Sequence, residues 1–201
     1  MECFIKSLNK EVNILVATSG DTGSAVAHGF YGIKGVNVII LYPKGKVSKI
    51  QEKQLTTLDK NIFALEIDGT FDDCQKLVKN AFSDKSLKEK INLSSANSIN
   101  IARLIPQSFY YAYSYVQLEN KQIPTIFSVP CGNFGNITDG IITKKMGVPI
   151  HQFIASTNLN DVVPKYLKTE KYNPKPSIQT ISNAMDVGNP SNMARILDMY
   201  S

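Results

Sequence analysis

Short apolar runs alternate with amphipathic segments along the first half of the chain. The apolar runs end at Gly, Pro or other turn residues, as buried strands of parallel sheets do. They predict strands over residues 13–18, 36–42 and 62–67. The segments between and after them predict helices over residues 21–34, 48–59 and 71–82. This β-α-β-α-β-α order is typical of a parallel sheet covered by helices, and therefore of the α/β class.

Polar residues and glycine mark the ends of these predicted helices. Asp21 is placed to cap the first helix, and Gly35 to end it. Ser48 is followed three residues later by Gln51, which is the pattern of a capping box.

A polar stretch over residues 92–97 interrupts the alternation. A long amphipathic helix is expected after it, over residues 98–118, with Ser98 as its cap. Two more strands and a helix between them are predicted over residues 125–129, 150–155 and 135–146, followed by a loop-rich segment with a short helix from about Asn192. We therefore expect two units: a smaller α/β unit over residues 11–95, and part of a larger α/β unit over residues 96–201.

The composition excludes several classes of protein. The chain has 201 residues, of which 43% are hydrophobic and 19% are charged, as in ordinary globular proteins. Its net charge of +5 comes from basic residues scattered among acidic ones, without the basic stripe of a nucleic-acid interface. No run approaches the roughly 18–20 apolar residues that span a bilayer. We expect neither a nucleic-acid nor a membrane partner.

The cysteines and histidines give no sign of a metal site. Cys3, Cys74 and Cys131 are far apart in the sequence, and His28 and His151 have no spaced partner. Cys131 is expected to be a small buried residue and not a nucleophile. Without a visible secretory signal, this cysteine usage indicates a reducing compartment, and the cytoplasm is the expected location.

The first candidate site is the loop Thr18-Ser19-Gly20-Asp21-Thr22-Gly23, between a predicted strand and a predicted helix. Ligands of α/β proteins bind at this end of the sheet. Asp21 would repel a phosphate in direct contact, so we expect it to face a hydrogen-bond donor. The hydroxyl groups of Thr18, Ser19 and Thr22 suit a substrate carboxylate. The alternative is a plain helix cap after a tight glycine turn.

The second candidate is the loop Gly132-Asn133-Phe134-Gly135-Asn136, which also joins a strand to a helix. It has two glycines three residues apart and no acidic residue, so its backbone N–H groups and the helix dipole suit a phosphate. The alternative is a connecting turn in which glycine serves the geometry alone. Neither loop is a Walker A motif.

Basic residues near two further helix starts are candidates for an anionic ligand. Lys46 lies in a run of lysines that the helix dipole disfavours. Asn100 and Arg103 are one helical turn apart, and arginine grips phosphate or carboxylate in a bidentate way. The alternatives are a solvated basic turn and a surface arginine.

Five motifs, in this order along about residues 12–200, resemble the threonine synthase family. They are VATSGDTGSAVAHGF, YPKGKVSKIQEKQLTTL, SSANSINIARLIPQ, SVPCGNFGNITDG and SNAMDVGNPSN. The resemblance implies the fold type II architecture of pyridoxal-phosphate (PLP) enzymes, related to tryptophan synthase β. It also implies two three-layer α/β units with mostly parallel sheets, incomplete at both ends in this chain.

The resemblance further implies an activity and a set of site residues. The family converts O-phospho-L-homoserine and water to L-threonine and phosphate, with PLP as cofactor. The implied cofactor-binding residues are Asp21, Gly132, Asn133, Phe134, Gly135 and Asn136. The implied substrate-binding residues are Thr18, Ser19, Thr22, Lys46, Asn100 and Arg103. Whether the protein is a monomer or a homodimer stays open.

One part of the family pattern is absent. The lysine that binds the cofactor covalently lies upstream of SGDTG in this family, in a His-Gly-Pro-Thr and Phe-Lys-Asp context that the sequence lacks, and neither Lys6 nor Lys10 has that context. No catalytic residue is therefore assigned. We expect the chain to be an internal piece of a longer enzyme and inactive alone. The alternatives are a non-catalytic protein that binds PLP or phosphate, and another fold type II lyase such as a serine/threonine dehydratase.

Overall fold

The structure, a computed structural model, describes residues 11–98 and 100–201. Cys3, Lys6 and Lys10 lie outside these ranges. The chain divides between Asn97 and Ser98 into two compact units.

A parallel sheet forms the centre of the first unit. Its strands are β1 (Val12–Ala17), β2 (Val36–Pro43), β3 (Ile62–Ile67) and β4 (Leu93–Ser95), in the order β3-β2-β1-β4. All three pairings are parallel, as the alternation of apolar runs and amphipathic segments predicts. Parallel neighbours need crossover connections, and those connections place helices on both faces of the sheet.

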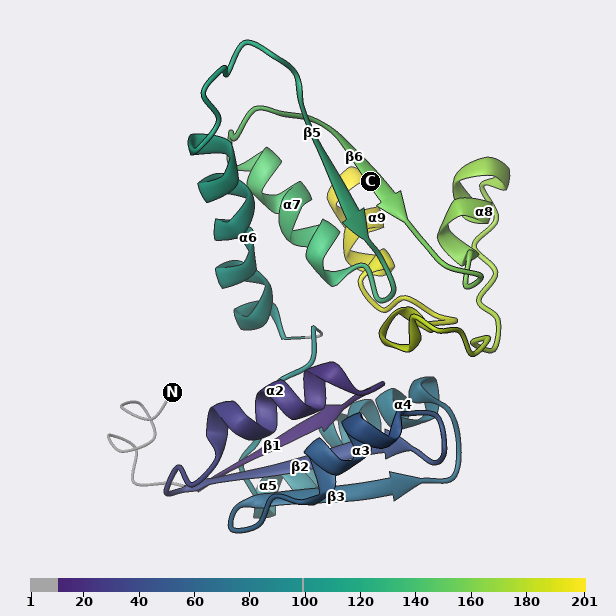
Figure 1. Cartoon of the computed structure of the whole chain (residues 1–201). Coiled ribbons are helices and arrows are strands. Elements are labelled where there is room, and N and C mark those ends of the chain that lie inside the picture. The colour runs from purple at the N-terminus through teal and green to yellow at the C-terminus, as the bar shows by residue number, and fades with distance from the viewer. Residues whose placement is uncertain (1–10, 99) are drawn as a thin grey trace. The chain divides into compact units, whose positions relative to one another are not determined.

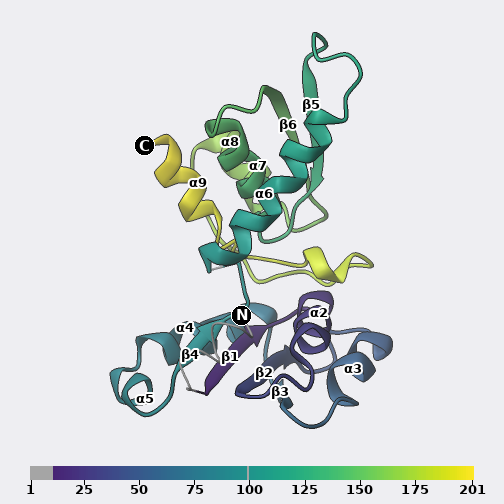
Figure 2. The same ribbon diagram turned by 90° about the vertical axis from the view of Figure 1, so that its left-hand side faces the viewer.

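Helices of the first unit lie on both faces of this sheet. They are α2 (Asp21–Phe30), α3 (Lys49–Thr56), α4 (Phe71–Ser83) and α5 (Lys85–Lys90). Helices α2 and α3 lie on one face, and α4 and α5 on the other (Figure 2). The core between the layers is aliphatic and includes the fully buried Val16, Val38 and Leu55.

The second unit has a two-stranded parallel sheet among its described residues. Strand β5 (Thr125–Pro130) pairs with β6 (Ile150–Ser156). Helix α7 (Gly135–Lys145) lies between α6 (Ile101–Val116) and α9 (Met193–Tyr200) (Figure 1). Helix α8 (Val162–Thr169) and a 3₁₀ turn (Asn183–Met185) complete this unit. No helix in the described part of the chain is long and apolar enough to cross a membrane.

Aromatic rings form much of the core of the second unit. Tyr111 meets Phe127 edge to face at 5.0 Å and Phe153 at 5.9 Å between ring centroids. Tyr111 also donates a hydrogen bond of 2.8 Å to the backbone oxygen of Asn136. The aromatic core therefore reaches the first turn of α7.

Several predicted helix ends are wrong. Gly20, with φ of 140°, is the residue before α2. Asp21 is the first residue of the helix, so the capping position belongs to Gly20 and not to Asp21. The helix ends at Phe30, before Gly32 and Gly35 turn the backbone at φ of 73° and 81°. Asn100, and not Ser98, caps α6 by accepting a 3.0 Å hydrogen bond from the Ala102 N–H.

Other elements were predicted correctly or missed. The capping box of Ser48 and Gln51 is confirmed at the start of α3. Strand β4 falls in the stretch predicted to be only polar, and α5 and α8 were not predicted. These three elements are short, and β4 and α5 lack a clear apolar period.

Candidate functional site

The loop between β5 and α7 enters its helix through a left-handed residue. Phe134 has φ of 59° and ψ of 17°, immediately before the helix. A left-handed conformation costs a residue with a side chain about 1–2 kcal/mol. The Phe134 ring is 4% exposed and packs in the core with Val129 and Ile137, which offsets this cost. The buried ring therefore holds the loop in a strained turn.

The backbone N–H groups of this loop are available to a ligand. In the part of the chain that the structure describes, the N–H groups of residues 132–136 donate to no protein acceptor. They lie at the N-terminal end of α7, where the helix dipole favours negative charge. This geometry suits an anion, as the sequence predicts for this loop.

The asparagine side chains of the loop are used to hold the loop itself. The Asn133 amide donates to Ser98 Oγ at 2.7 Å, and its Oδ1 accepts from the Ser191 N–H at 2.7 Å. The Asn136 amide donates to the Pro130 oxygen at 3.0 Å. Both side chains fix the backbone, so the contact that the loop offers a ligand comes from its N–H groups.

Asn192 and Arg195 complete a network that we name the loop clamp, which consists of Ser98, Asn133, Ser191, Asn192 and Arg195. Asn192 is fully buried and donates to Ser98 Oγ at 2.9 Å and to the Asn133 oxygen at 3.1 Å. Arg195 donates to Asn192 Oδ1 at 2.8 Å and to the Ser98 oxygen. The clamp ties the loop to the starts of α6 and α9, segments far apart in the sequence.

Glycine is required at position 132 of this loop. A Cβ atom there would lie 2.7 Å from the Cα atom of Met185, closer than atoms of this kind approach. At Gly135 a Cβ atom would lie 3.3 Å from Ser98 Cβ, a tight contact that small shifts relieve. The close approach of the backbones at residues 132 and 185 therefore explains why residue 132 is glycine.

A buried carboxylate lies in α7 behind the loop. Asp139 is 0% exposed, and neither of its carboxylate oxygens accepts a hydrogen bond in the described structure. Burial raises the pKa of Asp139 to about 7, although the charges of Arg103 and Arg195 oppose this. Burial also lowers the pKa of Arg103, which Asp139 partly counteracts.

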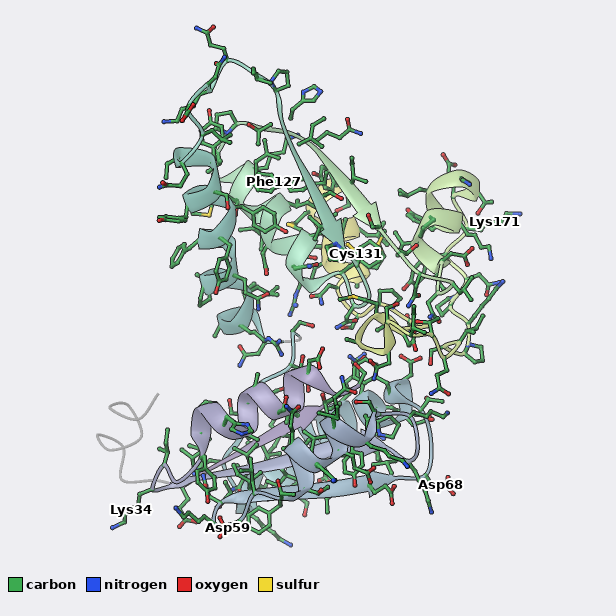
Figure 3. All side chains as sticks on the ribbon, viewed as in Figure 1. Lys34, Asp59, Asp68, Phe127, Cys131 and Lys171 are labelled. Atoms are coloured by element: carbon green, nitrogen blue, oxygen red, sulfur yellow. The ribbon has the colours of Figure 1, made fainter. Side chains whose placement is uncertain are left out.

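Cys131 is a structural residue at the end of β5, where Figure 3 labels it. It is buried, its thiol donates to the Val129 oxygen at 3.1 Å, and burial raises its pKa to about 12. A thiol with so high a pKa is not an activated nucleophile. The prediction of a small buried residue is confirmed.

In the first unit, Thr18 organises the loop after β1. It is 1% exposed, and its hydroxyl oxygen accepts hydrogen bonds from the N–H groups of Gly20 at 2.9 Å and Gly23 at 2.8 Å. Asn97 holds the preceding residue, Ala17, by bonding its N–H at 2.8 Å and its oxygen at 2.7 Å. Both ends of the loop are therefore fixed by buried polar side chains.

The other predicted residues of the first unit lie nearer the surface. Asp21 is exposed and accepts a 2.7 Å hydrogen bond from the Gln51 amide at the start of α3. Ser19 and Thr22 are half-buried, and Lys46 is exposed. Of the predicted residues in the second unit, Asn100 caps α6 and Arg103 lies one turn into that helix.

Several polar residues in and behind these loops were not predicted from the sequence. They are Asn97, Ser191, Asn192, Asp139 and Arg195. The position of Ser191 and Asn192 in the fifth motif was a signal, but their contact with Asn133 is across 58 and 59 residues. The described residues hold no group of His, Cys, Asp and Glu side chains that suits a metal ion.

Comparison with known proteins defines the class. Residues 1–201 match the family described as pyridoxal-phosphate dependent enzyme, so the chain belongs to that family, whose cofactor is PLP. It is 54% identical over 202 residues to the threonine synthase of Buchnera aphidicola subsp. Acyrthosiphon pisum, covering 100% of this chain and 47% of that protein.

Solved structures agree with the sequence relatives. The crystal structure of threonine synthase from Escherichia coli matches with a TM-score of 0.93 and 47% identity, over 99% of this chain and 47% of that one. The PLP-bound threonine synthase from Brucella melitensis matches with a TM-score of 0.83 and 39% identity, over 99% and 43%. The resemblance and the fold type II class are confirmed, and the chain spans less than half the length of these relatives.

Proposed function

We propose that the chain is part of a threonine synthase and that residues 132–136 bind the phosphate group of PLP. The observation that carries this proposal is the set of N–H groups at the start of α7 that have no protein acceptor among the described residues. A tetrahedral dianion fits several converging N–H groups at a helix N-terminus. The crowding at Gly132 and the left-handed Phe134 keep this backbone in place.

The remaining predicted residues are assigned by unit. In the first unit, Asp21 accepts a hydrogen bond from a hydroxyl group of the cofactor, and the hydroxyls of Ser19 and Thr22 donate hydrogen bonds to a substrate carboxylate. Thr18 keeps its predicted place in that group, although its oxygen already accepts two N–H groups of the loop.

Cationic and amide side chains are assigned to the substrate phosphate. These side chains are Lys46 in the first unit and Asn100 and Arg103 in the second. Their charge and hydrogen-bond donors suit a phosphate ester. O-Phospho-L-homoserine is the substrate class that these groups and the relatives support. PLP, when bound, supplies an electron sink for carbanions next to the amino group of the substrate.

Residues outside this chain supply the lysine that moves the proton and binds the cofactor covalently. The chain alone is therefore expected to bind PLP without making threonine. The cytoplasm is the proposed location, and the choice between monomer and homodimer remains a prediction.

The test compares PLP with pyridoxal, which lacks the phosphate. Isothermal titration of the 201-residue chain is expected to show binding of PLP and at least tenfold weaker binding of pyridoxal. Gly132→Ala should remove the difference, because its Cβ atom would meet Met185. Gly29→Ala, where an added Cβ meets nothing within 4 Å, is the matched control. Equal binding of PLP and pyridoxal by the unmodified chain would contradict the proposal.

A further inference from the structure

The buried carboxylate of Asp139 has no role in the phosphate site as described so far. It lies one helical turn beyond Gly135 on α7, with 0% exposure and no hydrogen bond to either oxygen in the described structure. A buried polar group without a partner costs about 1–3 kcal/mol, and more when it is charged. Such a cost is expected where a residue serves a site and not the fold.

Charged and titratable groups on the elements around α7 act electrostatically on Asp139. Helix α6 contributes Arg103 and Tyr111, and α9 contributes Arg195. The Tyr111 hydroxyl is neutral at physiological pH, because burial raises its pKa further. On β6 the titratable side chain is the exposed His151, and Cys131 before the loop is a buried thiol. The two arginines therefore supply the positive charge near this carboxylate.

Arg195 connects this charge to the phosphate loop. It donates to Asn192 Oδ1 and to the Ser98 oxygen. Asn192 then donates to the backbone oxygen of Asn133 and to Ser98 Oγ, which also accepts from the Asn133 amide. The orientation of Arg195 therefore affects Asn192, and through Asn192 it affects the backbone of Asn133 in the middle of the loop.

We propose that Asp139 is a positioning residue for the phosphate site: its ionised carboxylate orients Arg195 and Arg103, and Arg195 holds the loop clamp. This rests on the proposed function, in which residues 132–136 bind a phosphate. Loss of the negative charge leaves the two guanidinium groups without their common counter-charge, so the clamp loosens and the N–H groups of the loop no longer converge as well.

The positioning role makes anion affinity depend on pH. The pKa of Asp139 is near 7, so the carboxylate loses its proton as the pH rises through neutrality. The ionised form attracts Arg195, so the affinity of the loop for a dianion should rise over that interval. PLP and inorganic phosphate titrate in the same range, whereas sulfate is a tetrahedral dianion throughout and is therefore the better probe.

The experiment measures sulfate affinity of the 201-residue chain, from the sulfate-dependent increase in Tm, between about pH 5 and about pH 9. The affinity of the unmodified chain should rise about tenfold across neutrality. Asp139→Asn should bind about tenfold more weakly at high pH and lose this rise. Glu119→Gln, which removes an exposed negative charge, should behave as the unmodified chain.

The outcomes separate this inference from the proposed function. A chain that binds neither sulfate nor PLP contradicts the phosphate site itself. A chain that binds sulfate with the same affinity and the same pH profile in the unmodified and Asp139→Asn forms contradicts the role of Asp139 alone. A purely structural role would shift the Tm of Asp139→Asn by the same amount at every sulfate concentration, and that result also overturns the inference.

Discussion

At the scale of single residues, buried polar groups decide the shape of both loops. The side-chain oxygens of Thr18 and Asn133 accept hydrogen bonds from backbone N–H groups of their own units. The carboxylate oxygens of Asp139 accept no hydrogen bond in the described structure. The first two side chains stabilise the fold, whereas the third destabilises it.

Removal of the Thr18 hydroxyl should destabilise the first unit. Thr18→Val keeps the shape of the side chain but leaves the buried N–H groups of Gly20 and Gly23 without their acceptor. The expected loss is about 1–3 kcal/mol in the free energy of unfolding, measured by urea titration. Thr18→Ser keeps the hydroxyl and should lose clearly less. Equal losses would show that the methyl group, and not the oxygen, matters.

Asp139 should make the stability of the chain fall as the pH rises. Its pKa in the folded protein, about 7, is above the ordinary value of 3.8, so folding favours the protonated form. The stabilisation is present below about pH 4, decreases as the pH rises toward 7, and is lost above it, by roughly a few kcal/mol. Asp139→Asn should remove this dependence and be the more stable form at about pH 8. Urea titrations at both ends of the interval measure it, and an unchanged dependence would exclude Asp139 as its source.

At the scale of elements, helix α2 contains two glycines in opposite surroundings. Gly23 is buried, and a Cβ atom there would lie 2.6 Å from Thr18 Cγ2 and 2.9 Å from Leu55 Cδ2. Gly29 is exposed, with nothing within 4 Å of the same atom. One glycine allows α2 to pack against the loop and α3, and the other only weakens the helix.

The same substitution should therefore have opposite effects at these two positions. Gly23→Ala should lower the free energy of unfolding by about 1–3 kcal/mol, because the packed core must shift. Gly29→Ala should raise it by up to about 1 kcal/mol, because alanine favours the helix. Thermal unfolding of the two variants against the unmodified chain measures both. A gain in stability at Gly23 would contradict the tight packing.

The elements also show what the sequence can and cannot predict. The buried strands and the capping box at Ser48 were predictable, because period and capping are local. The cap of α6 was placed on Ser98, but the Ser98 hydroxyl instead accepts from Asn133 and Asn192. The loop clamp joins residues up to 97 positions apart, so no local sequence pattern predicts it. The position of residues 132–136 as a loop between a strand and a helix was predictable, because the glycines and the helix are adjacent in the sequence.

At the scale of the whole molecule, the second unit leaves apolar surface exposed. On α6 the side chains of Ile101, Ile105, Phe109 and Tyr113 are between 49% and 67% exposed, at intervals of four residues. Such a stripe on a helix normally packs against another element. The chain spans less than half the length of its relatives, so this face is expected to make the isolated chain self-associate.

A polar substitution on this face of α6 should reduce self-association of the chain without unfolding it. Phe109→Ser should reduce self-association, measured by analytical ultracentrifugation, and change the free energy of unfolding little. Leu104→Ala, on the buried side of the same helix, should instead cost about 2–5 kcal/mol. Undiminished association of Phe109→Ser would show that the helix face is not the contact.

The pairing of β1 with β4 has a consequence for synthesis on the ribosome. Asn13 pairs with Leu93, and Ala17 is held by Asn97, which lies 80 residues later. At about 5–20 residues per second, roughly 4–16 s separate the synthesis of β1 from that of its second neighbour. During that interval one edge of β1 has no partner strand, and the loop at Thr18 lacks one of its anchors. During synthesis, this strand edge is therefore open to pairing with other chains until β4 has been made.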